Sequence, residues 1–379
     1  MPDIFDIAII GGGIAGTSVA YFLAGQRSVV LLEQETSLGY HSTGRSAAEF
    51  TRRFHSEITG RLTRASAGFL TAPPDGFAEV DLLRPRGNLL IADTNKADHL
   101  NDVFERETHN TPQDAPPVEL LRVDQALEKV PFLDPGWVKA AFYDPDCWDV
   151  EVENLLQGYA RGAKQAGTDF RQDCTVSNAR RETDHWVLDT CGGEVRARIV
   201  VNAAGGWADT IARILGAAPL GIVPHRRTAI SVKITEYDVS DMPEVNEIDE
   251  LFYFKPDAGQ LMVSPADETP VDPHDAWPEE LDVAYAAHYL SECSTLEVDH
   301  IAHSWAGLRT FAKDRLPVIG HSGTTDGLFW LAGLGGYGIQ TSPAVGQIAA
   351  AQLLGTALPD TAVQAGISVS SFSPSRFES

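Results

Sequence analysis

The sequence predicts an α/β protein in which a parallel sheet with crossover helices is joined to a smaller, mainly antiparallel β-sheet domain. Buried strands followed by glycine-rich turns and helices recur at residues 5–24, 198–215 and 328–354, a succession typical of parallel strands. Between the last two, residues 227–263 alternate like antiparallel strands, and Pro256–Gly259 is a hairpin-turn sequence. Since the parallel signals stand at the start, middle and end, we expect the parallel-sheet domain to be discontinuous.

The chain has 379 residues, which is too many for one ordinary core. We predict that residues 1–75, 143–218 and 302–366 form the first domain, and that residues 76–142 and 219–301 form the second. The polar stretch after Leu358 is expected to be loosely ordered, and residues 367–379 are set apart from both domains as a tail.

The charge balance excludes several classes of partner. The chain carries 53 acidic and 29 basic residues, a formal charge of −24, so neither nucleic acid nor an anionic membrane surface is expected as a partner. The apolar stretch Ile4–Gly25 is interrupted by Asp6 and three glycines, which argues against a signal peptide and against membrane insertion. The four cysteines form no CxxC pair, so we expect no metal site and a soluble protein of the reducing cytoplasm.

The N-terminal unit begins with a short β-rich run, Phe5–Ile10, which ends in three glycines. Ile14–Ala24 then reads as a helix with small residues on one side, and Ser28–Leu32 reads as a second buried strand. This order of strand, turn, helix and strand is a βαβ unit, which requires a parallel pair of strands.

Within this unit, Gly11-x-Gly13-x-x-Gly16 follows the strand and opens the helix. Gly11 allows the tight turn, Gly13 lets the backbone approach a pyrophosphate, and Gly16 lets helix and strand pack closely. Glu33 ends the next strand, where an acid binds the ribose hydroxyls of an adenosine. The combination predicts a Rossmann-type dinucleotide site with the pyrophosphate at the positive helix end.

Two distal segments favour FAD over NAD, because FAD is long and its flavin end needs support far from the first turn. One segment is Asn202–Trp207, a second switch from strand through glycine to helix, and the other is Gly333–Gln340. We predict that Thr341 or Ser342 caps the following helix, with Pro343 in its first position. The positive end of that helix would face the pyrimidine edge of a flavin.

Five blocks together resemble a known family. They are Gly11–Gly16, Tyr40–Ala48, Val201–Gly205, Trp305–Arg309 and Gly335–Ser342. In this order they resemble the D-amino-acid oxidase superfamily over nearly the whole chain, and within it the bacterial FAD-dependent D-arginine dehydrogenases. The resemblance implies noncovalent FAD on a Rossmann-type domain, with the smaller β-sheet domain capping the flavin. No cysteine follows Cys293, which argues against the C-terminal covalent attachment found in the sarcosine-oxidase branch. The cofactor contacts that it implies are Gly11, Gly13, Ala15, Gly16, Glu33, Gln34, His41, Ser42, Thr43, Gly44, Arg45, Ser46, Ala47, Ala48, Val176, Ala204, Gly205, Trp207, Gly335, Gly338, Ile339, Gln340 and Thr341.

The substrate side follows first from chemistry, since an amino-acid oxidase must hold a carboxylate and arginine grips it bidentately. Arg227 and Arg309 stand on or beside predicted strands near the flavin segments, and Tyr253 lies on the facing hairpin. The resemblance implies that these three residues hold the α-carboxylate and that the Gly336 carbonyl receives the amine.

Three positions depart from the D-arginine enzymes. Asn88 stands where they carry a glutamate for the guanidinium, Phe54 where they carry a mobile tyrosine, and Glu49 where a histidine lies beside the flavin. The missing carboxylate at Asn88 predicts a preference for neutral or apolar D-amino acids, unless another acid such as Glu49 binds a cationic side chain.

The expected reaction is oxidative deamination of a D-amino acid to a 2-oxo acid and ammonia, with hydride passing from Cα to flavin N5 and no dedicated catalytic side chain. The alternative is a related flavoenzyme that oxidises glycine, sarcosine, another N-substituted amino acid or a 2-hydroxy acid. A flavin-binding protein without activity is the third possibility. The electron acceptor, oxygen or a quinone-like molecule, stays open.

Overall fold

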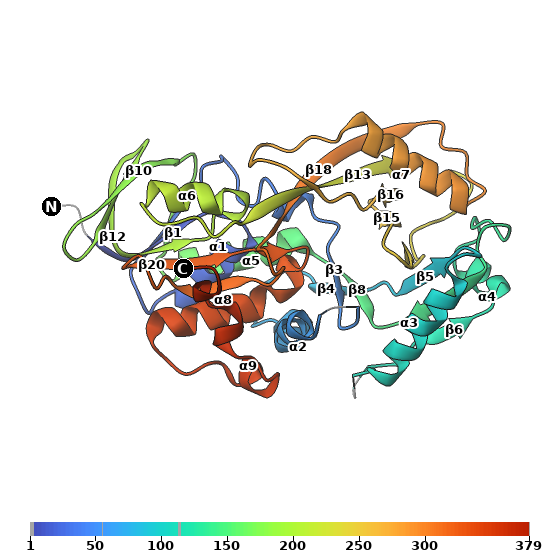
Figure 1. Cartoon of the computed structure of the whole chain (residues 1–379), viewed down its shortest axis with the longest axis horizontal. Coiled ribbons are helices and arrows are strands. Elements are labelled where there is room, and N and C mark those ends of the chain that lie inside the picture. The colour runs from blue at the N-terminus through green and yellow to red at the C-terminus, as the bar shows by residue number, and fades with distance from the viewer. Residues whose placement is uncertain (1–3, 55, 113–114, 379) are drawn as a thin grey trace.

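The computed structural model describes residues 4–54, 56–112 and 115–378. Two large sheets occupy the two ends of its long axis (Figure 1). The first sheet contains β1 (Phe5–Ile10), β2 (Val29–Leu32), β9 (Asp169–Arg171), β10 (Val176–Arg181), β11 (Trp186–Thr190), β12 (Gly193–Asn202), β19 (Val318–His321) and β20 (Leu328–Ala332).

The centre of the first sheet is parallel, in the order β9, β2, β1, β12 and β20, while β10, β11 and β19 add antiparallel edges. Helices cover both faces, so its central strands are buried on both sides. Ile7 and Ile9 of β1 pack into the core that holds α1 (Ile14–Leu23) and α8 (Gly338–Leu354). Ala8 and Ile10 point the other way, into the core of α6 (Ala208–Ile214).

Three further helices lie on the α1 side of this sheet. They are α2 (Glu57–Thr71), α5 (Val152–Gln165) and α9 (Asp360–Gln364). The α1 and α8 helices approach closely, because a β-carbon on Gly346 would lie only 2.9 Å from the side chains of Ser18 and Phe22. The lack of a side chain at Gly346 therefore lets α8 pack closely against α1 beside the sheet.

The second sheet is larger and mainly antiparallel. It contains β5 (Asn88–Ala92), β6 (Glu119–Leu121), β7 (Ala140–Asp144), β13 (Val223–Val232), β14 (Glu244–Glu247), β15 (Tyr253–Asp257), β16 (Gln260–Ser264), β17 (Thr269–Pro270), β18 (Ile301–Phe311) and β21 (Leu334–Gly335). The turn between β15 and β16 has positive φ at both Ala258 and Gly259, as a two-residue type I′ hairpin requires. One pairing differs from the expectation: β14 and β5 are parallel, because they come from distant parts of the chain rather than from one hairpin.

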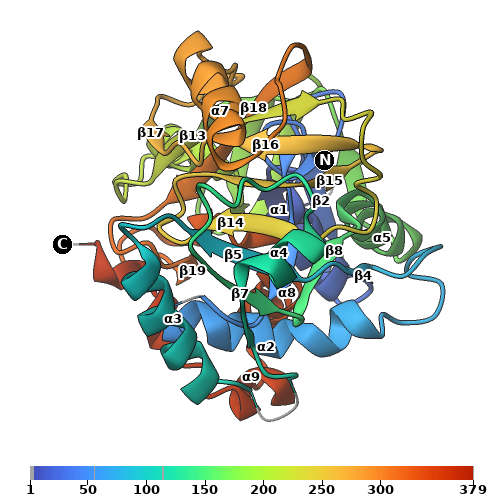
Figure 2. The same cartoon turned by 90° about the vertical axis from the view of Figure 1, so that its right-hand side faces the viewer.

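Helices α3 (Ala97–His109), α4 (Val123–Lys129) and α7 (Glu280–Cys293) pack around the second sheet (Figure 2). A small third sheet joins β3 (Glu49–Thr51), β8 (Cys147–Val150) and β4 (Leu83–Pro85). The strands of the two large sheets alternate along the sequence. Strand β18 hydrogen-bonds within the second sheet, although the predicted boundaries give residues 302–311 to the first domain.

Two expectations about the C-terminal region are wrong. Helix α8 begins at Gly338, one turn before the predicted cap, so Pro343 lies inside it. The helix tolerates this proline because the Ser342 hydroxyl donates to the Ile339 carbonyl at 2.9 Å, taking the hydrogen bond that Pro343 cannot supply. The tail is also ordered: Phe372 is buried in the core of the first sheet, and Arg376 pairs with Asp314.

The described part of the chain includes no helix with the length and apolar character needed to cross a bilayer.

Candidate active site

A single elongated cavity of about 450 Å³ joins the predicted cofactor segments to the predicted substrate residues. Its walls come from the β1–α1 turn, the end of β2, the loop 39–48, the β12–α6 turn, several strands of the second sheet, and the segment 331–340. The carboxyl ends of the parallel strands β1, β2, β12 and β20 therefore open onto one cavity, as ligand sites of parallel sheets do.

The glycine turn has the geometry that a bound pyrophosphate needs. Gly11 has a φ of +109°, and a β-carbon there would lie 2.3 Å from the Ala203 carbonyl oxygen. A β-carbon on Gly16 would lie 1.9 Å from the Gly11 oxygen, which fixes how closely α1 meets β1. Gly13 differs from both, because the nearest atom to its β-carbon would be Thr43 Oγ1 at 3.5 Å. Its open side faces the cavity at the start of α1.

Two side chains hold this turn in place. The Glu33 carboxylate accepts hydrogen bonds from the backbone N–H groups of Gly12 at 2.6 Å and of Glu35 at 2.9 Å. Burial raises the pKa of the Glu33 carboxyl, and those two backbone N–H groups oppose the rise. Thr43 Oγ1 accepts from the first helical N–H, that of Ile14, at 3.0 Å. The remaining N–H groups at this helix end stay available to an anion.

The loop 40–48 contacts both domains, since Thr43 holds the start of α1 and Arg45 reaches the second sheet. Arg45 donates to the carbonyls of Ala276 and Ala306 at 2.9 and 3.0 Å and pairs with Asp275 at 2.5 Å. His41 lies against the Trp207 ring, with 4.4 Å between the ring centroids, and its Nε2 is 2.8 Å from a Glu35 oxygen. The loop therefore connects the two domains across the cavity.

Most predicted cofactor residues line this cavity, and three do not. Gly16, Gly44 and Thr341 lie outside the cavity wall. Gly16 serves α1–β1 packing, and the Thr341 hydroxyl donates back to the Tyr337 carbonyl within its own helix. The residues that line it are Gly11, Gly13, Ala15, Glu33, Gln34, His41, Ser42, Thr43, Arg45, Ser46, Ala47, Ala48, Val176, Ala204, Gly205, Trp207, Gly335, Gly338, Ile339 and Gln340.

The start of α8 gives the second helix end at the cavity. Gly338, Ile339 and Gln340 occupy its first turn and line the cavity, so the positive end of the helix faces in. The Gln340 side-chain oxygen accepts from the Thr51 N–H at 3.1 Å, which joins this turn to β3. The helix end has the expected direction, although the expected capping residues are wrong.

Arg309 is the most unusual side chain of the cavity. Among the described residues it has neither a carboxylate partner within 4.0 Å nor a hydrogen bond from its guanidinium. Burial lowers its pKa, and the nearby Arg227 guanidinium lowers it further. An anion bound in the cavity beside these two positive charges would reduce their mutual repulsion and the cost of burying them.

Arg227 and Tyr253 lie on the same side. Arg227 Nε donates to the Asp267 carbonyl at 2.8 Å, and its Nη2 is 3.4 Å from the Glu268 carboxylate. Its guanidinium carbon lies 5.9 Å from the centre of the Tyr253 ring. Arg227 lies in the middle of β13 rather than at its start. The structure therefore brings Arg227, Tyr253, Arg309 and Gly336 together at one end of the cavity.

Phe54 and Asn88, from which the preference for the substrate side chain was predicted, lie differently relative to the cavity. Phe54 lines the cavity and has a φ of +65°, a rare conformation for an aromatic residue. Asn88 is 3 % exposed and does not line the cavity, because Asn246 stands in front of it and donates to its Oδ1 at 3.0 Å. The amide that faces the cavity is therefore that of Asn246.

Sequence reasoning missed the polar wall formed by β14 and the loop after it. Glu244, Asn246 and Glu250 line the cavity, together with Glu49 from β3. Alternate residues of a strand face the same side, so Glu244 and Asn246 form one polar face. Identifying β14 as a strand would have shown this pair, but the sequence could not show which face meets the cavity.

The fold, the glycine turn and the cavity at the carboxyl ends of the parallel strands define a dinucleotide-binding protein of the Rossmann type. Residues 6–352 match the family described as FAD dependent oxidoreductase, so the chain belongs to that family and binds FAD. The open Gly13 side and the two helix ends that line one cavity fit this cofactor.

Two curated relatives and one solved structure are similar to the chain. Glycine oxidase of Geobacillus kaustophilus (strain HTA426) is 27% identical over 362 residues, covering 92% of this chain and 93% of that protein. Mitochondrial dimethylglycine dehydrogenase of Homo sapiens is 26% identical over 370 residues, which span 91% of this chain and 42% of that longer protein. The crystal structure of the Geobacillus kaustophilus glycine oxidase superposes with a TM-score of 0.83 at 24% identity and covers 98% of each chain, which confirms the fold.

Proposed function

We propose that this chain oxidises the carbon–nitrogen bond of an α-amino acid or N-substituted amino acid whose carboxylate is held by Arg309 and Arg227. The observation that carries the proposal is the Arg309 guanidinium, which faces the cavity without an anionic partner among the described residues. A substrate carboxylate would supply that partner in the bidentate geometry that arginine favours.

The relatives favour the glycine-type and N-substituted substrates of the alternative over a D-amino acid. Proteins named glycine oxidase and dimethylglycine dehydrogenase match across 92% and 91% of the chain. D-amino acids stay in the proposal as a second candidate, because Arg227, Tyr253, Arg309 and Gly336 meet at one end of the cavity.

The residues of the pocket would orient the substrate rather than attack it. Arg309 and Arg227 would fix the carboxylate, and the Gly336 carbonyl beside Arg309 would accept a hydrogen bond from the amine. FAD, when bound, supplies the acceptor for the hydrogen and the electron pair that leave the substrate carbon. Water then hydrolyses the imine to a carbonyl product and ammonia or an amine. The electron acceptor of the second half-reaction, oxygen or a quinone-like molecule, is left open.

An anaerobic reduction screen tests the proposal. The FAD-loaded protein is mixed without oxygen with glycine, sarcosine, N,N-dimethylglycine, D- and L-amino acids and 2-hydroxy acids, and the loss of flavin absorbance is followed. We expect reduction by a carboxylate-bearing amine and much slower reduction by the same compound esterified. Reduction by 2-hydroxy acids alone would refute an amine substrate.

A further inference from the structure

We infer that Glu49 and Glu244 form a second recognition site in the cavity, which takes a cationic nitrogen on the substrate at a distance from its carboxylate. The inference rests on the proposed function, because it assigns the remaining polar wall of the same pocket. It also reverses the preference for neutral side chains that Asn88 suggested.

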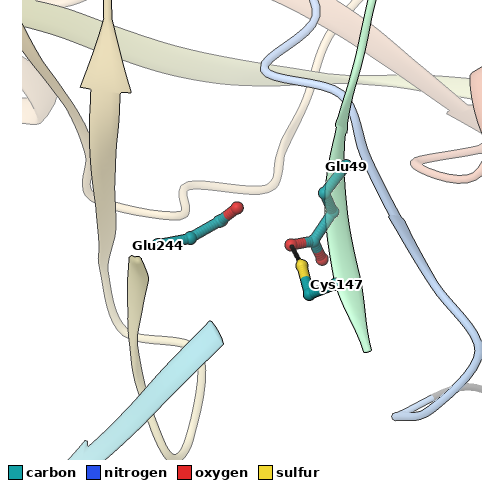
Figure 3. A group of neighbouring side chains, drawn as sticks. All are labelled: Glu49, Cys147 and Glu244. Carbon is teal, nitrogen blue, oxygen red and sulfur yellow. Dashed lines mark hydrogen bonds between the residues drawn. The ribbon is translucent and has the colours of Figure 1, made fainter. Parts of the chain in front are cut away.

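The two carboxylates face one another from different sheets. Glu49 lies on β3 of the small sheet and Glu244 on β14 of the second sheet, and their side chains point toward each other (Figure 3). One carboxylate oxygen of Glu49, one of Glu244 and the Cys147 sulfur all lie within 4.8 Å of one another. Both glutamates line the cavity.

The Glu244 carboxylate is buried beside the cavity and is incompletely hydrogen-bonded there. The residue is 4 % exposed, and its Oε2 has no hydrogen-bond partner among the described residues. Its Oε1 accepts a long hydrogen bond from Asn246 Nδ2 at 3.4 Å. The buried Glu244 carboxyl group faces the half-buried one of Glu49, and two such groups at close range need a proton or a cation between them.

Burial favours the neutral form of Glu244, so a proton on this carboxyl group can fill the role when no cation is bound. Burial raises the pKa of Glu244 well above its ordinary value, and the neighbouring Glu49 carboxylate raises it further. The surrounding charges balance without an added ion: Lys255 pairs with Asp149 at 2.8 Å, and Arg86 pairs with the same carboxylate at 2.6 Å. A substrate ammonium group would replace the proton and donate to both glutamates.

A metal ion is the competing occupant, because Glu49, Cys147 and Glu244 together have the composition of a three-ligand site. Three observations favour an organic cation. Cys147 lies behind the cavity wall and does not line it. The Cys147 thiol donates a hydrogen bond to Glu49 Oε2, with 3.5 Å between sulfur and oxygen. Burial raises the pKa of this thiol well above its ordinary value, which favours the protonated form over the thiolate that a metal needs. The buried Lys255 ammonium, which interacts with both glutamates, would repel a divalent ion about twice as strongly as a singly charged ammonium group.

The test is equilibrium binding to the FAD-loaded protein by titration calorimetry. The ligands are 4-aminobutanoate, 5-aminopentanoate and 6-aminohexanoate, each compared with the straight-chain carboxylate of the same length. These probes carry the carboxylate and the distal ammonium but no α-amine, so they measure recognition without turnover. We expect the ammonium to tighten binding by about tenfold or more at one chain length.

Glu49→Gln and Glu244→Gln should each remove that advantage, whereas Glu128→Gln, the same substitution on the exposed side of α4, should keep it. The comparison of ligands on the unaltered protein decides the question even if a variant folds poorly. If plain carboxylates bind and the ammonium adds less than threefold, this inference is wrong and the proposed function stands. If neither ligand type binds, the carboxylate site and the proposed function fail together with it. Stoichiometric Zn²⁺ binding that Cys147→Ser abolishes would also overturn the inference in favour of a metal site.

Discussion

The Arg309 guanidinium lies against the backbone of Gly336, so that a β-carbon on Gly336 would be 3.0 Å from Arg309 Cζ. We expect Gly336→Ala to displace Arg309 and to raise KM by about tenfold, because a shifted charge-assisted contact to the carboxylate weakens by this order. Steady-state kinetics with the best substrate of the reduction screen would measure it. Gly68→Ala is the control, since a β-carbon at that helical glycine meets no atom within 4 Å. Equal kinetics in both variants would show that Gly336 does not position Arg309.

Replacing the arginines separates substrate binding from cofactor binding. Arg309→Ala should raise KM by roughly ten- to hundredfold. Arg227→Ala should have a smaller effect, because Arg227 already interacts with Asp267 and Glu268. FAD content, measured from the absorbance ratio of flavin to protein, should be unchanged in both. A change in KM below about twofold for both variants would place the carboxylate elsewhere.

Two glycines of the same turn should fail in different ways. Gly13→Val should fold but lose FAD, because its side chain would extend into open cavity where the pyrophosphate binds. Gly11→Val should not fold normally, because its β-carbon would collide with the Ala203 carbonyl. Circular dichroism and flavin content distinguish the two. Full FAD retention by Gly13→Val would contradict the assignment of the pyrophosphate to this turn.

Glu244 should make stability depend on pH. Since burial raises its pKa in the folded state, the folded protein holds a proton that the unfolded chain releases once the pH exceeds about 4.5. Its contribution to stability is therefore present at low pH and is lost as pH rises toward the folded-state pKa. The Tm of Glu244→Gln, relative to the unaltered protein, should rise between pH 5 and pH 8. A constant difference over this range would show that Glu244 has an ordinary pKa.

The proline within α8 gives a stability test. Ser342→Ala would leave the Ile339 carbonyl without its hydroxyl donor, and would also remove the contact between Ser342 Oγ and Tyr159 Oη at 3.2 Å. The loss should be about 1–3 kcal/mol in urea unfolding of the FAD-loaded protein. Adding Pro343→Ala restores a backbone N–H at that carbonyl and should recover part of the loss. An additive or larger loss in the double variant would contradict this account.

Local sequence determined the N-terminal strand, turn and helix, because each residue there acts on its neighbours. Gly11 must adopt positive φ, and Ile7–Ile10 must be buried on both faces. The same reasoning located the β12 and β20 segments and the Ala258–Gly259 turn. It misplaced the start of α8, since Ser342 and Pro343 resemble a helix start unless the hydrogen bond from Ser342 to Ile339 is known.

Tertiary structure alone decided what faces the substrate. Asn88 was predicted to line the pocket, but β14 pairs with β5 so that Asn88 lies beside Glu244 and accepts a hydrogen bond from Asn246, and these two residues line the cavity instead. Glu49 and Glu244 meet because β3 and β14, which are distant in the chain, pack around one cavity. Backbone conformation is set by short-range sterics, which a sequence displays directly. The approach of side chains from separate strands depends on register and sheet packing, which no local pattern specifies.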